Sequence, residues 1–480
     1  MIKGVEFLEL DKDLQAIQQA RDLAREAKKA QNTLARMSQQ QLNAIVEAVA
    51  KAFAEAAPEL AELAVQETGF GNVKDKITKN EFASKQVLSA IEHMTCVGVL
   101  NENPREKLWE IGVPVGVICG IVPSTNPTST VCYKAMIALK SGNTIVFSPH
   151  PKAIACTLKA AEIVAKAAEA AGAPKGSVGC LTIPSMAGCK ELMGSPDVNL
   201  ILATGGPAMV KAAYSSGKPA IGVGAGNGPV YIHHSADVGK ALSCVLESKT
   251  FDYGTVCASE QSIIVEASME QQVKQTASQM GFYFMNTEEA GHLAKLLFKP
   301  NGTLNPEIVG KSALVLAEKA GFSVPNTTKV LVAREQEAGP TRPYSMEKLC
   351  PVLAFFVMEN EDAVLSKSME VLIHEGSGHT FAMHAEDEAV IRKFALQIPV
   401  SRFLVNTPAA LGGIGASTGL FPALTLGCGA VGGSSSSNNI SPMDLINIRR
   451  VAWGTEETKK QTVDTDLIEI LTAKILERLK

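Results

Sequence analysis

The residue whose type and neighbours most clearly suggest chemistry is Cys257, in the stretch Phe251-Asp252-Tyr253-Gly254-Thr255-Val256-Cys257-Ala258-Ser259. A thiolate that attacks an aldehyde or thioester carbon needs room, and the small residues Gly254 and Ala258 provide it. Upstream lies a glycine-rich turn, 222–229, that contains no carboxylate. A cysteine nucleophile without a nearby base to activate water predicts acyl transfer to a thiol. The alternative, for any one of ten cysteines, is a small buried hydrophobic side chain.

The elements that precede this cysteine follow a parallel α/β pattern. Apolar runs alternate with Ala/Lys-rich helical stretches, at 115–122, 144–147, 178–182 and 198–203. Continuous apolar strands separated by helices predict a parallel sheet covered on both faces, as in a Rossmann-like nucleotide-binding domain. Ligands of such sheets bind beyond the carboxyl ends of the strands. Thr204-Gly205-Gly206-Pro207 follows one of these ends and opens a helix whose amides can receive a phosphate.

Other segments frame this core. Residues 10–65 have the periodicity of two or three amphipathic helices, and 97–113 reads as a hairpin arm that we expect to serve oligomerisation. The glycine turn is expected to lead into an extended run, followed by a helix over 236–250 and a strand over 261–266. This second alternating block predicts a second α/β domain that carries Cys257.

The domain boundaries follow from these patterns. We expect a cofactor-binding domain over 1–228, a catalytic domain over 229–430 and a C-terminal arm over 431–460. The Gly/Ser-rich stretch 427–439 is expected to be a flexible bridge to that arm. Residues 461–480 are expected to form a linker and an amphipathic tail helix, which would dock on a partner or pack on its own oligomer.

Composition narrows the function classes. The net charge is −4 and the pI is near 6.1, and no run of Lys or Arg predicts a nucleic-acid or anionic-membrane surface. The N-terminus lacks the features of a signal peptide, and no apolar stretch is long enough to cross a membrane. Scattered cysteines indicate free thiols in a cytoplasmic protein without a structural metal.

Several segments together resemble CoA-acylating members of the aldehyde dehydrogenase superfamily, close to the aldehyde dehydrogenase half of bifunctional aldehyde/alcohol dehydrogenases. The resemblance covers about residues 10–455 and rests on eight segments in family order: 121–130, 203–207, 211–217, the glycine turn, the Cys257 stretch, 347–351, 376–380 and 425–429. It implies the aldehyde dehydrogenase fold, a nicotinamide cofactor and coenzyme A as co-substrate.

The resemblance also implies residue roles. Cys257 would be the nucleophile, and the side-chain amide of Asn126, with the backbone N–H of Cys257, would bind the oxyanion. Without the resemblance, Asn126 would be interpreted as a helix cap. Cofactor binding is expected at Pro123, Ser148, Pro149, His150, Thr204, Gly205, Gly206, Gly224 and Glu347. Ser148 stands where relatives often have lysine, so NAD is expected and NADP stays open.

The position that carries the deacylating glutamate in hydrolytic relatives is Val223 here. The resemblance therefore implies a thioester on Cys257 that survives until CoA intercepts it, giving reversible oxidation of a short-chain aldehyde, acetaldehyde or propionaldehyde. His379 is expected to assist CoA or to be structural, and Thr255 and Val256 are expected to line a small pocket. Arg402 keeps an anionic aldehyde, sulfoacetaldehyde or succinate semialdehyde, open as an alternative.

Two other classes remain: a hydrolytic aldehyde dehydrogenase and a non-catalytic structural or shell-binding member. Turnover without CoA would indicate the first, and the absence of Cys257-dependent activity would indicate the second. We expect a homodimer or larger assembly. The tail resembles peptides that target enzymes to bacterial microcompartment shells, so a shell or partner protein is a further expectation.

Overall fold

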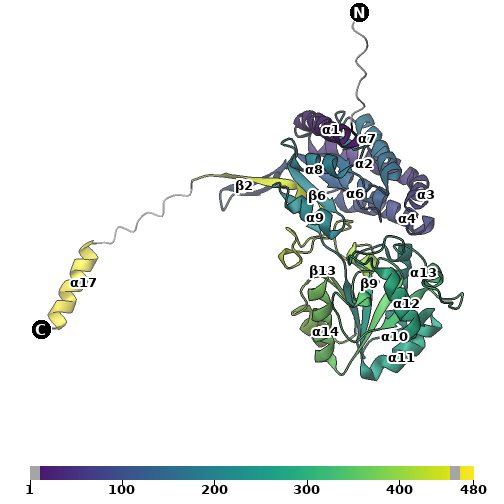
Figure 1. The fold of residues 1–480 in the computed structure, drawn as a ribbon. Helices are drawn as coiled ribbons and strands as arrows, with labels where there is room; N and C mark the ends of the chain where they lie inside the picture. The colour runs from purple at the N-terminus through teal and green to yellow at the C-terminus, as the bar shows by residue number, and fades with distance from the viewer. Residues whose placement is uncertain (1–10, 455–464, 480) are drawn as a thin grey trace, which may run out of the picture.

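The computed structural model describes residues 11–454 and 465–479, which form two α/β lobes, a projecting arm and a tail helix (Figure 1). Each lobe is built on a parallel sheet. The predicted α/β fold class is therefore confirmed. The first ten residues and residues 455–464, which include the N-terminus and part of the predicted linker, lie outside the described residues.

The first lobe contains a five-stranded sheet in the order β5-β4-β3-β6-β7. Its strands are β3 Val117–Ile121, β4 Thr144–Ser148, β5 Val178–Cys180, β6 Leu200–Thr204 and β7 Ala220–Val223. All neighbouring pairs are parallel. The four strands predicted from apolar runs are confirmed, because burial on both faces requires continuous apolar sequence.

Helices cover both faces of this sheet. The N-terminal helices are α1 Lys12–Leu34, α2 Gln39–Glu55 and α3 Ala57–Thr68, as predicted. They are followed by α4 Val73–Glu81, the π-helix η1 Phe82–Gln86, α5 Val87–Ile91, α6 Pro127–Lys140, α7 Ile154–Ala170, α8 Met186–Gly194 and α9 Pro207–Tyr214. Ile118 packs with α2, α6 and α7, whereas its neighbours Val117 and Cys119 pack with α1 and α8. Alternate strand residues thus build separate cores on the two faces.

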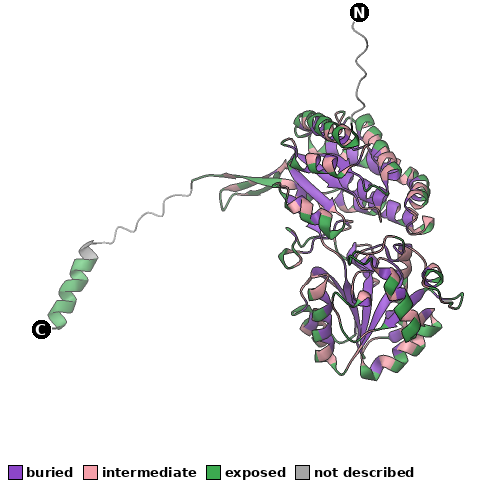
Figure 2. Ribbon diagram, viewed as in Figure 1, coloured by how far each residue is buried: buried purple, intermediate pink, exposed green. Residues whose placement is uncertain are grey.

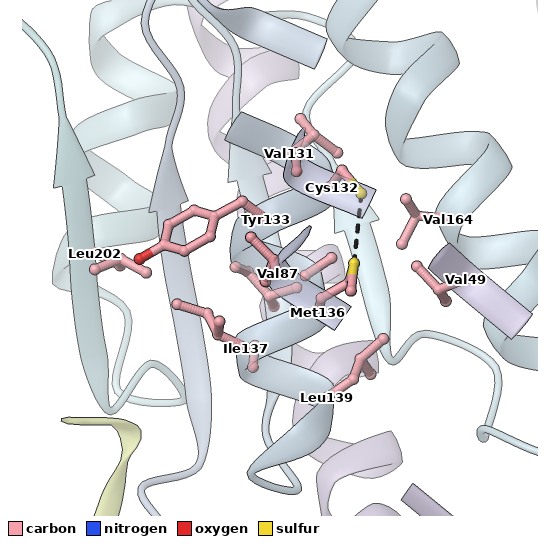
Figure 3. Packing of buried hydrophobic residues seen from close by; sticks show 14 of the residues in the cluster. Val49, Val87, Val131, Cys132, Tyr133, Met136, Ile137, Leu139, Val164 and Leu202 are labelled. Atoms are coloured by element: carbon pink, nitrogen blue, oxygen red, sulfur yellow. Dashed lines mark hydrogen bonds between the residues drawn. The ribbon is translucent and has the colours of Figure 1, made fainter. Parts of the chain in front are cut away.

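Helix α6 is buried along its whole length. Its side chains pack on both sides, with the Sγ atom of Cys132 3.6 Å from the Sδ atom of Met136 (Figure 3). Lys134 is buried within this helix and donates to the carbonyl of Ile121 at the end of β3 and to the carbonyl of Leu202 in the middle of β6. Asn126, the N-cap residue of α6, is therefore attached directly to a rigidly packed helix.

The second lobe contains a seven-stranded parallel sheet in the order β10-β11-β12-β9-β8-β13-β14. The strands are β8 Gly228–Ile232, β9 Glu260–Glu266, β10 Phe282–Phe284, β11 Val330–Arg334, β12 Val352–Met358, β13 Gly378–His384 and β14 Val400–Val405. The helices are α10 Val238–Thr250, α11 Glu270–Gln279, α12 Thr287–Leu297, α13 Ala313–Ala320, α14 Glu361–His374, α15 Glu388–Ala395 and α16 Ala409–Gly413. The predicted extended run, helix and strand correspond to β8, α10 and β9.

A three-stranded antiparallel sheet forms the arm. The predicted hairpin is β1 Gly98–Asn103 and β2 Leu108–Pro114, and β15 Ile446–Ala452 pairs with β2 as the third strand. The large apolar side chains Val99, Trp109, Ile448 and Trp453 are exposed on it, and the two tryptophan rings contact each other edge to face.

The expectation of a flexible bridge at 427–439 is wrong. The hydroxyl of Ser434 donates to the carbonyl of Gly222, and the Arg402 guanidinium donates to the carbonyl of Gly427, at 2.7 Å in both cases. Cys428 is fully buried. Glycine and serine supply close backbone approach and hydrogen-bonding groups here, which a reading of composition alone takes for a linker.

The tail helix, α17 Thr465–Arg478, is present as predicted and lies apart from both lobes (Figure 1). Its described side chains are all exposed, including Ile468, Leu471, Ile475 and Leu479 (Figure 2). Among the described helices, none combines the length and the apolar character that a bilayer crossing requires.

Candidate active site

Cys257 lies in the loop between the 3₁₀ turn η2 Phe251–Gly254 and strand β9. Three consecutive residues of that turn have left-handed backbone: Asp252 with φ 48°, Tyr253 with φ 51° and Gly254 with φ 76°. Only glycine adopts this region without cost, so the first two positions store strain of about 1 kcal/mol or more each. Strained backbone of this kind persists only where surrounding contacts hold it.

The Asp252 carboxylate supplies those contacts. It is fully buried and accepts from the Nζ atoms of Lys76 at 3.0 Å and Lys79 at 2.5 Å, and from the backbone N–H of Asn72 at 2.9 Å. The Thr255 hydroxyl donates to the same carboxylate at 2.7 Å. Burial alone would raise the pKa of Asp252, but the two ammonium groups outweigh it and hold that pKa below its ordinary value.

Asn126 occupies the N-cap position of α6, yet its side chain makes no capping hydrogen bond. Its Oδ1 atom accepts from Nζ of Lys79 at 2.6 Å, and its Nδ2 atom lies 3.2 Å from Oγ1 of Thr125 and 3.4 Å from the carbonyl of Thr255. The capping interpretation is therefore not supported. Asn126 and Cys257 line the same cavity, of about 490 Å³.

The glycine turn packs directly against the nucleophile loop. A Cβ atom at Gly226 would lie 1.8 Å from the carbonyl oxygen of Cys257, so no side chain fits at this position. The Gly226 N–H donates to Oε1 of Glu347 at 2.9 Å. The turn thus brings Cys257 and Glu347 to one wall of the cavity.

A second cavity, of about 640 Å³, adjoins the first. Both are lined by Pro123, His150, Thr204, Gly205, Gly206 and Pro207, and the second extends to Ser148, Pro149 and Lys190. A Cβ atom at Gly206 would meet no protein atom within 4 Å, so this glycine leaves space at the start of α9. An elongated ligand that spans both cavities could reach from β4 to Cys257, with an anionic group at the α9 amides.

Of the other residues predicted for the site, Gly224, Thr255 and Val256 also line the Cys257 cavity. His379 and Arg402 line neither cavity and are buried beneath the wall. The Nδ1 atom of His379 lies 2.8 Å from Oγ1 of Thr380, and its Nε2 atom has no hydrogen-bond partner among the described residues. Burial and the neighbouring Arg402 place the pKa of His379 well below its ordinary value, so this imidazole is neutral.

Electrostatics keep the Cys257 thiol protonated in this state. Burial, then Glu347, then Cys428 raise its pKa to about 12, against an opposing effect of Arg402. Burial and Glu375 raise the pKa of Glu347 to about 8. Glu347 is the single carboxylate among the described residues that line the Cys257 cavity, and Val223 lines it at the end of β7.

Sequence reasoning missed Lys76, Lys79 and the role of Asp252. Charged residues spaced along a polar helix such as α4 are ordinarily solvated, and the helix has no apolar face that predicts burial. The nearest signal was the position of Asp252 five residues before the candidate nucleophile. A carboxylate within a buried turn needs a partner, but sequence alone does not say which lysines supply it.

The chain is similar to known proteins of one family. The model of the aldehyde dehydrogenase family matches residues 13–281. The bifunctional aldehyde-alcohol dehydrogenase of Escherichia coli (strain K12) is 46% identical over 435 residues, which cover 90% of this chain and 49% of that protein. The chain thus spans about half the length of the curated aldehyde-alcohol dehydrogenases it matches.

Solved structures match over nearly the whole chain. An acetylating aldehyde dehydrogenase from Geobacillus thermoglucosidasius is 49% identical with a TM-score of 0.92, covering 94% of this chain and 100% of that one. A propionaldehyde dehydrogenase from Rhodopseudomonas palustris, solved with bound propionyl-CoA, is 28% identical with a TM-score of 0.83, covering 90% and 94%. The resemblance predicted from the sequence is confirmed. The chain belongs to the aldehyde dehydrogenase family.

Proposed function

We propose that the protein catalyses reversible, NAD-dependent oxidation of a short-chain aldehyde, acetaldehyde or propionaldehyde, to the acyl-CoA. The observation that carries this proposal is the Cys257 cavity, which is lined by a thiol, the Asn126 amide and Val223; by the resemblance, Val223 takes the place of the glutamate of hydrolytic relatives. The names of the acetylating and CoA-bound relatives support the same reaction.

The first step is addition of the Cys257 thiolate to the aldehyde carbon. A C–S bond forms, and the carbonyl oxygen takes the negative charge. The Asn126 amide and the backbone N–H of Cys257 stabilise that oxyanion, and one such donor is typically worth about 3–4 kcal/mol in the transition state. The thiol proton must first pass to solvent, because burial and Glu347 keep the resting thiol neutral.

Oxidation and acyl transfer follow at the same carbon. A bound nicotinamide would supply the hydride acceptor for the thiohemiacetal carbon, and loss of that hydride would leave a thioester on Cys257. We assign Thr204, Gly205, Gly206 and Glu347 to hold that cofactor, since they line the joined cavities. The CoA thiolate then attacks the thioester carbon, and Cys257 departs as the thiolate.

Glu347 is the carboxylate that could be considered as a base for hydrolysis, because it lines the Cys257 cavity. We assign it to cofactor binding instead. Its Oε1 atom already accepts from Gly226, and its pKa of about 8 leaves it mostly protonated at neutral pH. A protonated carboxyl group is a poor general base for water. The thioester therefore persists for CoA, itself a good nucleophile.

We assign an uncharged aldehyde over an anionic one. The alternative of an anionic aldehyde depended on Arg402. The guanidinium of this residue is buried and donates to Gly427, Asn439 and Thr380. It does not line the cavity. Comparing kcat/KM for propionaldehyde and succinate semialdehyde tests this assignment, and a preference for the second would contradict it.

For the cofactor we propose NAD, with NADP accepted less well. Among the described residues that line the larger cavity there is no carboxylate to repel a 2′-phosphate, and His150 and Lys190 lie there. There is equally no arginine to bind it firmly. The ratio of kcat/KM for the two cofactors measures the preference, and a strict requirement for NADP would contradict this assignment.

The exposed apolar side chains of the arm support a homo-oligomer in which arms pack against a second copy. The exposed face of α17 supports a separate role in docking a partner or shell protein. Deletion of residues 461–480 tests the second role: unchanged assembly and co-purification would remove the partner hypothesis.

The test of the proposed reaction is direct product analysis. Wild-type protein given aldehyde, NAD and CoA should form acyl-CoA and NADH in equal amounts, and Cys257→Ala should form neither. Carboxylate as the main product in the presence of CoA would overturn the proposal.

A further inference from the structure

The Lys79 ammonium bridges two parts of the proposed site: the Asn126 side chain, which would bind the oxyanion, and the segment that precedes Cys257. It lies on α4 and is buried, and its three N–H groups are directed at Oδ1 of Asn126 at 2.6 Å, Oδ2 of Asp252 at 2.5 Å and Oγ1 of Thr255 at 2.9 Å. Asn126 supplies the side-chain amide, and Thr255 lies two residues before Cys257. One side chain therefore contacts Asn126 and the segment that leads to the backbone N–H of Cys257.

The chemistry of lysine decides which end of the Asn126 amide faces it. An ammonium group donates only, so the atom that it contacts must be the amide oxygen. The amide N–H groups are then directed away from Lys79. Without this contact, a rotation of the Asn126 amide by half a turn would place its oxygen where the oxyanion forms.

We propose that Lys79 is a positioning residue that fixes the amide orientation of Asn126 and so completes the oxyanion site. The inference rests on the proposed function, since it presupposes that Asn126 binds the oxyanion. Lys79 does not act as a nucleophile or a base in this account. Its ammonium is held by Asp252, and Gly71 gives that carboxylate room, since a Cβ atom there would lie 1.7 Å from Oδ1.

Lys76 provides a matched control. It lies one turn earlier on α4, is equally buried and pairs with the same carboxylate at 3.0 Å. Its other hydrogen bond goes to the backbone carbonyl of Thr125 at 2.9 Å and not to a group proposed to bind substrate. Replacing either lysine removes one positive charge beside Asp252. Of the two replacements, only that of Lys79 also removes the hydrogen bond to the Asn126 amide.

The experiment compares Lys79→Met, Lys76→Met, Asn126→Ala and the double variant Lys79→Met/Asn126→Ala in the full-length protein. The readouts are kcat/KM for CoA-dependent aldehyde oxidation and the rate of Cys257 alkylation by iodoacetamide, a displacement that needs no oxyanion site. We expect Lys79→Met and Asn126→Ala each to lower kcat/KM by about 10²-fold, the usual cost of losing one oxyanion donor. The double variant should be no worse than Asn126→Ala, because both changes remove one function.

Alkylation separates positioning from general damage to the loop. The largest influences on the pKa of Cys257 are burial, Glu347, Cys428 and Arg402, so alkylation of Lys79→Met should stay close to the wild-type rate. Lys76→Met should lose thermal stability with a much smaller loss of kcat/KM. Equal losses of kcat/KM in both lysine variants, or multiplied losses in the double variant, would overturn the inference.

A second pair of variants covers the case in which methionine prevents folding. Lys79→Gln keeps an N–H donor toward Asn126 but loses the charge, and Lys76→Gln makes the same charge change at the control position. Lys79→Gln should retain more activity than Lys79→Met. If Lys79→Met does not fold, Lys79→Gln should retain more activity than Asn126→Ala. The reverse order in either comparison would overturn the inference. If Asn126→Ala loses activity but Lys79→Met keeps it, the inference about Lys79 is overturned while the proposed role of Asn126 stands. Full activity in Asn126→Ala would overturn the proposed role of Asn126 and this inference with it.

Discussion

The N–H of Gly226 donates to Oε1 of Glu347 at 2.9 Å, while the Cα of the same glycine faces the carbonyl oxygen of Cys257. The turn that carries a catalytic glutamate in hydrolytic relatives thus holds a carboxylate from another part of the chain. That carboxylate lies close enough to raise the pKa of the Cys257 thiol. After burial, the charge of Glu347 is therefore the main influence that lowers the resting reactivity of the nucleophile.

Replacing Glu347 with Gln should speed alkylation of Cys257 above pH 8. The carboxyl group has a pKa of about 8, so at higher pH its negative charge raises the thiol pKa and lowers the thiolate fraction. Removing that charge should increase the iodoacetamide rate several-fold at pH 9 and little at pH 6.5, where Glu347 is protonated. An unchanged rate at pH 9 would show that Glu347 does not act on the thiol.

Substituting Gly226 with Ala should damage the site, whereas Gly224 with Ala should fold normally. The new Cβ at 226 would lie 1.8 Å from the Cys257 carbonyl, but at 224 the nearest protein atom outside the adjoining residues is 3.8 Å away. Thermal denaturation should show a Tm drop of several degrees for the first variant and a near wild-type Tm for the second. Equal Tm values for the two variants would contradict the close packing of turn and nucleophile loop.

The overall architecture could be read from the sequence because its signals are local. Continuous apolar runs gave β3, β4, β5 and β6, and the turn residues near Asn103 gave the hairpin of the arm. Cys257 and Asn126 could be proposed from the sequence because the motifs around them are specific, and both line one cavity. The partnership of Lys79 with Asn126 joins residues far apart in the chain, and no local pattern encodes it.

The wrong expectation of a flexible bridge at 427–439 arose because a local sequence signal was misleading. Four serines after two glycines look like a linker, yet Ser434 and Ser435 donate hydrogen bonds to the carbonyls of Gly222 and Ala220. Hydroxyl groups that are hydrogen-bonded to a strand are indistinguishable by composition from hydroxyl groups in solvent. The tertiary structure alone decides between the two.

Replacing Val223 with Glu should divert the acyl group from CoA to water. Val223 lines the Cys257 cavity at the end of β7, so a carboxylate there would reach the thioester and activate water. The variant should form NADH without CoA faster than the wild type, with carboxylate as product. Val223→Gln, which has a similar shape without a basic group, is the control and should not gain CoA-independent turnover.

Asn126→Asp should be less active than Asn126→Ala. The aspartate would pair with Lys79, since the asparagine oxygen already lies 2.6 Å from that ammonium. Its other oxygen would then face the developing oxyanion, which adds repulsion to the loss of a donor. Single-turnover NADH formation measures the effect, and activity of Asn126→Asp equal to the wild type would exclude the amide from the chemistry.

The measurement that tests the account most directly follows NADH absorbance from acetaldehyde and NAD, with and without CoA, for wild type and Cys257→Ala. The account predicts sustained turnover only when CoA is present, and no turnover in the variant, because the cavity holds the Cys257 thiol, and Glu347, the one carboxylate among the described residues that line it, is mostly protonated at neutral pH. Equal sustained rates without CoA, with acetate as the product, would contradict it.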